Sequence, residues 1–257
     1  MKGCQEGDQW SLKLITSSTQ QRCVYFNSIE ARDYWFAEVL SAQGYLEEPI
    51  EQYRPLEKLG EGAFGTVKMC EHKNTGMRVA IKFIRKSHIR KTFARTGSRF
   101  VELELSQLIS SQRSSNLVST IEAFEDEEFY YLVNELMQGG DLFNYVCEQR
   151  DQPLEEQHAK EIVKSVASGL RVLHNLNIVH RDIKIDNVLV SSILRGQATF
   201  KLADFGSSVQ LANERDTADE YTGTKGYMSP EILRGQDYNK AVDIYSLGAL
   251  MHALMTA

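Results

Sequence analysis

Apolar and polar side chains alternate near the beginning of the chain, and the pattern then changes to a helical period. Residues 10–15 alternate, residues 23–26 have high β propensity, and residues 17–21 between them favour a turn. From Ser28 onward the apolar residues fall close to one helical face, namely Ile29, Tyr34, Trp35, Val39 and Leu40. The pattern predicts two strands followed by an amphipathic helix.

A short acidic stretch that contains a proline, residues 47–52, separates this first segment from the rest of the chain. Beyond it, residues 79–84 and 129–133 are nearly uninterrupted apolar runs, which predict buried strands. We therefore expect a small segment, residues 1–46, a linker, and a larger domain over residues 53–257.

Composition narrows the class of protein only slightly. The 257 residues are 42% hydrophobic and 25% charged, and the net charge of −6 gives no general reason to expect a nucleic-acid partner. The four cysteines are far apart and lack zinc-ligand spacing, so a reducing, cytoplasmic environment is expected. No apolar run approaches the ~20 residues of a membrane-spanning helix, and the first residues lack the apolar core of a signal peptide.

A glycine-rich stretch, residues 59–67, is the first candidate for ligand binding. Glycine lets backbone N–H groups approach a phosphate closely, where a Cβ atom would clash. Such glycines also often mark an ordinary turn. Lys82 follows inside an apolar run, where an ammonium group is costly unless it is paired. The combination favours a phosphate-binding hairpin that contains Gly60, Gly62 and Gly65.

Two motifs carry most of the chemistry: His-Arg-Asp-Ile-Lys-Ile-Asp-Asn at residues 180–187, and Asp-Phe-Gly at residues 204–206. Phosphoryl transfer from ATP needs a base for the acceptor hydroxyl, cations for the phosphates and oxygen ligands for Mg²⁺. The motifs supply a carboxylate, a lysine, an amide and a second carboxylate: Asp182, Lys184, Asn187 and Asp204. They therefore predict ATP-dependent phosphoryl transfer.

The motifs follow one another at the spacings of a known family. The glycine-rich hairpin, Val-Ala-Ile-Lys, His-Arg-Asp, Asp-Phe-Gly and Ser-Pro-Glu resemble the catalytic domain of eukaryotic-type serine/threonine protein kinases. The resemblance implies an α+β, bilobal fold with a small β-rich lobe and a helical lobe. It also implies ATP and Mg²⁺ as cofactors and Ser/Thr hydroxyls of proteins as acceptors. Lys184, two residues after Asp182, is the serine/threonine form rather than the tyrosine form.

The resemblance implies that Lys82 holds the α- and β-phosphates and pairs with a glutamate on a helix over residues 100–110. Glu102 and Glu104 compete for that pairing. Glu104 is favoured because Leu108 then occupies the apolar position one turn later.

For the catalytic loop, the resemblance implies that Asp182 is the base and that Lys184 neutralises charge on the transferring phosphoryl group. Asn187 and Asp204 would hold Mg²⁺. The Thr224 hydroxyl would bridge Asp182 and Lys184.

The same resemblance locates the adenine site at a hinge. The Glu135 carbonyl and the Met137 amide would bind adenine. Four apolar side chains would flank the adenine ring: Leu59, Val67, Ala80 and Leu189. Asp141 would meet the ribose. Two positions depart from the family by being polar, Asn134 before the hinge and Thr120 beneath Leu108, so hydrophobic stacking between the lobes is expected to be weaker.

Regulation and specificity are hypotheses at this point. Arg181 precedes the base, and Glu220 stands where many relatives carry a phosphorylated threonine, so their ion pair could replace the phosphate. Thr222 and Thr217 remain alternative phosphorylation sites. Carboxylates at Asp141 and Asp186 match positions that favour an arginine upstream of the acceptor.

The first segment resembles the C-terminal part of a pleckstrin-homology domain, as a β-β-α remnant with a central tryptophan. A membrane phosphoinositide is expected only through the missing part of that domain. The kinase pattern continues beyond Ala257, so we expect a fragment at both ends or an incomplete gene model, which would leave the chain poorly folded or inactive.

Two other functions compete with an active kinase. A pseudokinase or scaffold would bind nucleotide without turnover, but its usual sign is loss of Lys82, Asp182 or Asp204, and all three are present. A lipid-binding adaptor would rest on the first segment alone.

Overall fold

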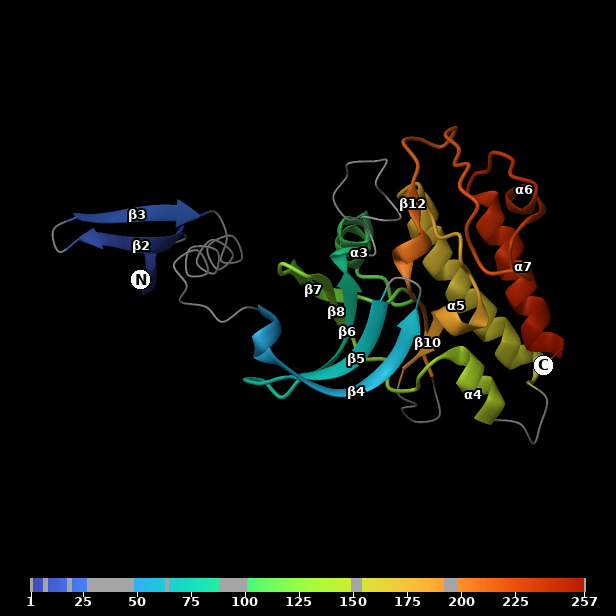
Figure 1. Ribbon diagram of the computed structural model, residues 1–257, viewed down its shortest axis with the longest axis horizontal. Coiled ribbons are helices and arrows are strands. Elements are labelled where there is room, and N and C mark those ends of the chain that lie inside the picture. Colours follow the sequence, from blue (N-terminus) through green and yellow to red (C-terminus); the bar gives the residue numbers. More distant parts are fainter. Residues whose placement is uncertain are drawn as a thin grey trace. The chain divides into compact units, whose positions relative to one another are not determined.

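The structure is a computed structural model, and it divides into two compact units, Met1–Arg54 and Pro55–Ala257 (Figure 1). It describes residues 2–6, 9–17, 20–26, 49–62, 65–87, 101–148, 154–191 and 198–256.

The described residues of the first unit include an antiparallel three-stranded sheet, in the order β1-β2-β3. Its strands are β1 (Lys2–Glu6), β2 (Gln9–Ser17) and β3 (Gln20–Phe26), and the 3-10 helix η1 (Pro49–Gln52) follows. β2 and β3 confirm the two predicted strands. β1 was not predicted because its sequence lacks apolar alternation; it pairs with β2 through the backbone. The helix predicted from Ser28, and with it most of the pleckstrin-homology resemblance, lies outside the described residues.

A five-stranded sheet in the order β4-β5-β6-β8-β7 lies at one end of the second unit (Figure 1). Its strands are β4 (Tyr53–Gly62), β5 (Gly65–His72), β6 (Arg78–Arg85), β7 (Thr120–Glu125) and β8 (Phe129–Glu135). The runs at 79–84 and 129–133 correspond to β6 and β8, and every residue of the two runs is buried or half-buried, which fits their continuous apolar sequence. Helix α3 (Val101–Ser111) packs beside β7.

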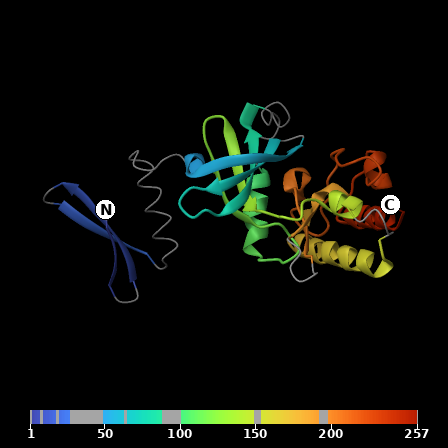
Figure 2. The same cartoon turned by 90° about the horizontal axis from the view of Figure 1, so that it is seen from below.

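Helices form the other end of this unit (Figure 2). They are α4 (Leu142–Glu148), α5 (Glu156–Asn175), α6 (Pro230–Leu233) and α7 (Ala241–Thr256). α5 packs against α7, and its apolar residues recur every three or four positions and are buried: Ala159, Ile162, Val166, Leu170 and Leu173. A sheet-rich part and a helical part within one unit confirm the predicted α+β organisation. No helix among the described residues is long and apolar enough to cross a membrane.

Two short antiparallel ladders hold the loops that carry the predicted motifs. β9 (Ile178–Val179) pairs with β12 (Val209–Gln210), and β10 (Val188–Val190) pairs with β11 (Phe200–Leu202). The 3-10 helix η2 (Ile185–Asn187) lies between β9 and β10, and η3 (Phe205–Ser207) lies between β11 and β12. Both motifs are therefore anchored at each end by paired strands.

Ser229, the residue before α6, is fully buried, yet its hydroxyl has no hydrogen-bond partner in the described part of the chain. A buried polar group without a partner costs about 1–3 kcal/mol. We therefore expect Ser229→Ala to raise the free energy of unfolding by about 1 kcal/mol in urea denaturation. Ser246→Ala is the matched control, because Ser246 is also buried but its hydroxyl has two carbonyl oxygens to donate to, that of Tyr227 at 2.7 Å or that of Val242 at 3.1 Å. That variant should lose stability, and equal effects of the two substitutions would contradict the prediction.

Candidate active site

Three charged side chains from distant parts of the chain meet where the sheet faces the helical part. Lys82 Nζ on β6 donates to Glu102 Oε1 on α3 at 2.6 Å and to Asp204 Oδ1 at 2.7 Å. The Lys82 and Glu102 side chains are 10% and 4% exposed, whereas Asp204 is 44% exposed. The lysine predicted from its apolar strand is therefore paired, and the pairing ties α3 to the sheet.

Burial and charge act in opposite directions on these groups. Burial alone would lower the pKa of Lys82, but the carboxylates of Glu102 and Asp204 raise it above its ordinary value. Burial raises the pKa of Glu102, and Lys82 only partly offsets this effect. Burial would also raise the pKa of Asp204, but Lys82 and the Gly206 N–H hold it below its ordinary value. The site therefore keeps a charged lysine beside an ionised Asp204 at neutral pH.

The prediction that Glu104 pairs with Lys82 is wrong. Glu102 makes that pair, and Glu104 is exposed. Buried residues of α3 fall at Glu102, Leu105, Ser106 and Ile109, which is the three-to-four spacing of one helical face. Glu104 lies two positions after Glu102, on another face of the helix. The apolar spacing of Leu105 and Ile109 was the signal that could have favoured Glu102.

Asp204 is aimed by an unusual backbone conformation. Its φ of 61° and ψ of 84° lie in the left-handed region, which non-glycine residues rarely adopt. Its Oδ1 also accepts a hydrogen bond from the Gly206 N–H at 3.3 Å. The next residue, Phe205, is buried and meets the His180 ring edge to face, with ring centroids 5.8 Å apart. The two motifs are therefore packed against each other through side chains.

The loop with the candidate base has the geometry that the resemblance implied. Thr224 Oγ1 donates to Asp182 Oδ1 at 2.6 Å and accepts from Lys184 Nζ at 3.0 Å. Lys184 Nζ also lies 3.2 Å from Asp182 Oδ2. Asn187 Nδ2 donates to the Asp182 carbonyl oxygen at 2.7 Å and to its Oδ2 at 3.0 Å. The predicted bridge by Thr224 is therefore present.

Asp243, at the start of α7, holds the backbone of this loop through its carboxylate. It is fully buried, and its carboxylate accepts from the backbone N–H groups of His180 and Arg181, each at 2.9 Å. His174 at the end of α5 lies 2.8 Å from the same carboxylate. The backbone of the base loop is thus fixed to two helices.

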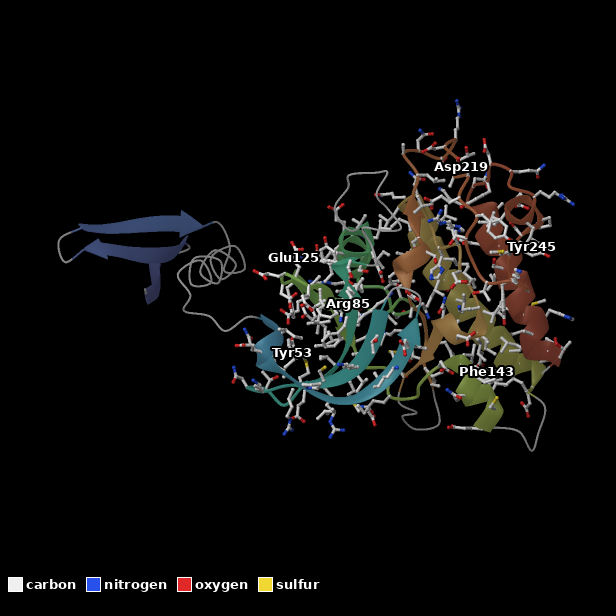
Figure 3. All side chains as sticks on the ribbon, viewed as in Figure 1. Tyr53, Arg85, Glu125, Phe143, Asp219 and Tyr245 are labelled. Carbon is white, nitrogen blue, oxygen red and sulfur yellow. The ribbon has the colours of Figure 1, made fainter. Side chains whose placement is uncertain are left out.

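The segment between β12 and α6, residues 211–229, is called here the activation segment, and Figure 3 labels Asp219 on it. Arg181 Nη1 donates to Glu220 Oε2 on this segment at 2.8 Å, so the predicted ion pair is present. Arg181 is 7% exposed and Glu220 is 58% exposed. Gly223 has a φ of 114°, and a Cβ there would lie 2.6 Å from the Arg181 carbonyl oxygen. Glycine therefore lets the segment approach the loop immediately before Thr224.

The nucleotide-binding candidates line the sheet-rich side. Val67 is directly opposite Lys82, and Ala80 is directly opposite Asn134 in antiparallel pairs, so these side chains share one face of the sheet. Leu59, Gly60 and Gly62 lie on β4, the neighbour of β5. Gly65 also lets β5 approach β6 closely, because a Cβ there would lie 2.1 Å from the Phe83 carbonyl oxygen.

The hinge candidates lie at the end of β8. Met137 packs with Val118 and Ala203, and Leu189 adjoins the same cluster. The Asp141 side chain accepts from the backbone N–H of Asn144 at 2.7 Å and so caps α4.

A hinge contact that sequence reasoning missed joins the two parts of the unit. Lys201 Nζ on β11 lies 2.7 and 2.8 Å from the two carboxylate oxygens of Glu135. Glu135 Oε1 also accepts from the Ser119 backbone N–H at 2.8 Å. Lys201 is the polar residue between two apolar neighbours on a short strand, and nothing in that pattern identifies its partner 66 residues away.

The two polar departures from the family pattern, Thr120 and Asn134, contact each other. Thr120 Oγ1 donates to Asn134 Oδ1 at 2.8 Å across the β7–β8 pair. We expect Thr120→Val to lower the free energy of unfolding by about 1 kcal/mol, because the side-chain oxygen Oδ1 of Asn134 loses its donor. The double variant Thr120→Val/Asn134→Leu should recover most of that loss, because both partners are then apolar. Urea denaturation of both single variants and the double variant measures the coupling, and strictly additive losses would contradict it.

The residues present fit Mg²⁺. Asp204 uses Oδ1 for both Lys82 and Gly206, so its Oδ2 faces neither. Asn187 donates through Nδ2, which directs its Oδ1 away from Asp182. One carboxylate and one amide oxygen are hard ligands, and Mg²⁺ in phosphoryl-transfer sites takes its remaining ligands from phosphates and water.

Comparison with known proteins agrees with this geometry. The family model described as protein kinase domain matches residues 53–257. The chain is 35% identical over 207 residues to calcium-dependent protein kinase 4 of Plasmodium berghei, covering 80% of this chain and 38% of that protein. It is 34% identical over 206 residues to calcium/calmodulin-dependent protein kinase type II of Caenorhabditis elegans, covering 80% and 27%. The corresponding alpha chain of Drosophila melanogaster is 32% identical over 206 residues, covering 80% and 37%. The chain thus spans well under half the length of these relatives.

Proposed function

Because this chain belongs to the protein kinase family, we propose that it is a serine/threonine kinase that transfers the γ-phosphate of ATP to hydroxyl groups of protein substrates. The observation that carries the proposal is the double contact of Thr224 with Asp182 and Lys184. It holds a carboxylate and an ammonium group around one hydroxyl, which is the arrangement that a substrate hydroxyl needs for phosphoryl transfer.

Each charged residue then has one task. Asp182 orients the substrate hydroxyl and accepts its proton, and Asn187 keeps the Asp182 carboxylate in place. Lys184 neutralises the charge on the oxygens of the transferring group. Lys82, held by Glu102 on α3, donates to phosphate oxygens of the nucleotide.

ATP supplies the phosphoryl group, and Mg²⁺ neutralises charge on the phosphates when both are bound. Asn187 and Asp204 would hold the cation, since the low pKa of Asp204 keeps it ionised. The backbone of Glu135 and Met137 would bind adenine, and the ion pair between Glu135 and Lys201 fixes the hinge that presents them.

A preference for serine or threonine and for basic substrates forms the finer part of the proposal. Lys184 in contact with Thr224 supports a serine/threonine acceptor. Asp186 is exposed within the base loop and Asp141 is half-buried, so both carboxylates are candidates to meet an arginine upstream of the acceptor.

The direct test is transfer of γ-phosphate from ATP·Mg²⁺ to a peptide with one serine and an arginine three residues before it. We expect transfer to this peptide, weaker transfer when the arginine becomes alanine, and none when tyrosine replaces the serine. Thermal stabilisation by ATP without any transfer would favour a nucleotide-binding pseudokinase instead. Equal transfer to the peptides with arginine and alanine would contradict the preference for basic substrates.

The Arg181–Glu220 ion pair supports activity without phosphorylation of the activation segment. We expect Glu220→Ala to lower kcat/KM for the peptide about fivefold, because an ion pair with one exposed partner contributes at most about 1 kcal/mol. Phosphatase treatment of the wild-type chain should change kcat/KM little.

Asp219→Ala is the control for the Glu220 substitution. It removes the neighbouring carboxylate, whereas the ion pair that the structure gives for Arg181 is with Glu220. An unchanged rate for Glu220→Ala, or a complete loss of wild-type activity after dephosphorylation, would contradict this regulation.

A further inference from the structure

Tyr238 is a buried tyrosine, 3% exposed, that none of the predicted motifs includes. Its hydroxyl donates to the Glu220 carbonyl oxygen at 2.8 Å and accepts from Arg181 Nη1 at 3.0 Å. Its backbone exchanges two hydrogen bonds with Ala218, each at 2.9 Å. One residue therefore holds the activation segment through both its main chain and its side chain.

Arg181 connects this contact to the catalytic base. Its guanidinium donates to Glu220 Oε2, to the Tyr238 hydroxyl and to the Ser207 carbonyl oxygen. Its own N–H is fixed by Asp243, and Asp182 is the next residue in the chain. The Arg181 backbone is thus fixed beside the base, and its guanidinium ties the activation segment to that fixed loop.

The Tyr238 contact differs from the Glu220 ion pair in its exposure to solvent. The Glu220 carboxylate is 58% exposed, so water and salt weaken its attraction to Arg181. The Tyr238 hydroxyl is enclosed, where hydrogen bonds are stronger. Burial raises the pKa of Tyr238, although Arg181 partly opposes this, so the hydroxyl remains a donor at neutral pH.

We propose that Tyr238 is a positioning residue, which clamps the activation segment at Glu220 and thereby holds Thr224 against Asp182. Three residues separate Glu220 from Thr224, and one of them, Gly223, lies close against the base loop. Loss of the hydroxyl would let the segment move while leaving the ring packed. The proposal rests on the proposed kinase function for its catalytic consequence, but the clamp itself is a property of the fold.

The test is Tyr238→Phe in the 257-residue chain, which removes the hydroxyl and keeps the ring. We expect kcat/KM for the serine peptide to fall about tenfold, a change that corresponds to ~1.4 kcal/mol. The KM for ATP should stay the same, because the nucleotide-binding residues are untouched. Hydrogen exchange of the Ala218 amide should become about tenfold faster while the midpoint of thermal unfolding changes little, since the opening is local.

Two comparisons separate positioning from general stability. Tyr245→Phe is the matched control, because Tyr245 lies on α7 (Figure 3) and its side chain is 48% exposed. Neither the kinetics of this variant nor its exchange at Ala218 should change. Tyr238→Phe and Glu220→Gln should be non-additive in kcat/KM, because both act through Arg181. Strict additivity of the two substitutions would contradict a shared clamp.

The outcomes also distinguish this proposal from the proposed function. If Tyr238→Phe speeds exchange at Ala218 but the wild-type chain transfers no phosphate, the clamp is supported and the kinase function is contradicted. Unchanged exchange would overturn the clamp whatever the activity. Faster exchange with an unchanged kcat/KM in an active chain would show that the segment is held but not positioned for catalysis, and would overturn the proposal.

Discussion

Asp182→Asn is expected to reduce phosphoryl transfer to the serine peptide by about 10³-fold, which is within the usual contribution of a general base. Asparagine has nearly the same shape, so the contact with Asn187 can be rearranged rather than lost. It cannot accept the proton of the substrate hydroxyl, and its amide group could donate to Thr224 Oγ1, which now donates to Asp182 Oδ1. The initial rate at saturating ATP·Mg²⁺ measures the effect.

Nucleotide binding should survive this substitution, because Lys82 and the hinge residues are unchanged. We expect the thermal stabilisation by ATP·Mg²⁺ to stay close to the wild-type value. Glu127→Gln, which removes an exposed carboxylate between β7 and β8, serves as the control and should retain full activity. Transfer by the Asp182→Asn variant within tenfold of the wild-type rate would remove Asp182 from the role of base.

Residues inside contiguous motifs could be predicted from the sequence because short loops fix their mutual geometry. Asp182 and Asn187 are only five positions apart, with Lys184 between them. Strands β9 and β10 hold both ends of their loop. The contacts of Glu220 with Arg181 and of Thr224 with Asp182 span about forty residues, and only the family resemblance could pair them. The apolar runs predicted β6 and β8 because most residues on both faces of these two strands are buried or half-buried.

The contacts that the sequence did not predict depend on which face a helix buries or on how two segments pair. Glu102 and Glu104 differ by two positions on one helix, and only the buried face of α3 distinguishes them. Thr120 and Asn134 were each recognised as polar departures, but their hydrogen bond requires the pairing of β7 with β8. Tyr238 reaches Arg181 and Glu220 through a bridge between two irregular segments, for which the sequence carries no periodic signal.

Replacing the carboxylate of α3 should have the second largest effect. Glu102→Gln is expected to lower kcat/KM about 100-fold, because Lys82 loses its charged partner on α3 and a misplaced catalytic group typically costs that factor. The substitution also leaves a buried ammonium with one carboxylate instead of two, so the free energy of unfolding should fall by about 3 kcal/mol. In this variant Asp204 is the remaining carboxylate beside Lys82, and its attraction to the lysine then competes with its binding of Mg²⁺. Peptide kinetics and urea denaturation measure the two effects.

Glu104→Gln is the matched control, with the same chemical change two residues along the same helix. Because Glu104 is exposed, we expect stability and kcat/KM within the small range of ordinary surface substitutions, about 0.5 kcal/mol. The pair of variants therefore tests the register of α3 directly. A large loss for Glu104→Gln together with a small loss for Glu102→Gln would mean that α3 presents the other carboxylate to Lys82 in solution. Large losses for both variants would mean that the helix alternates between the two pairings.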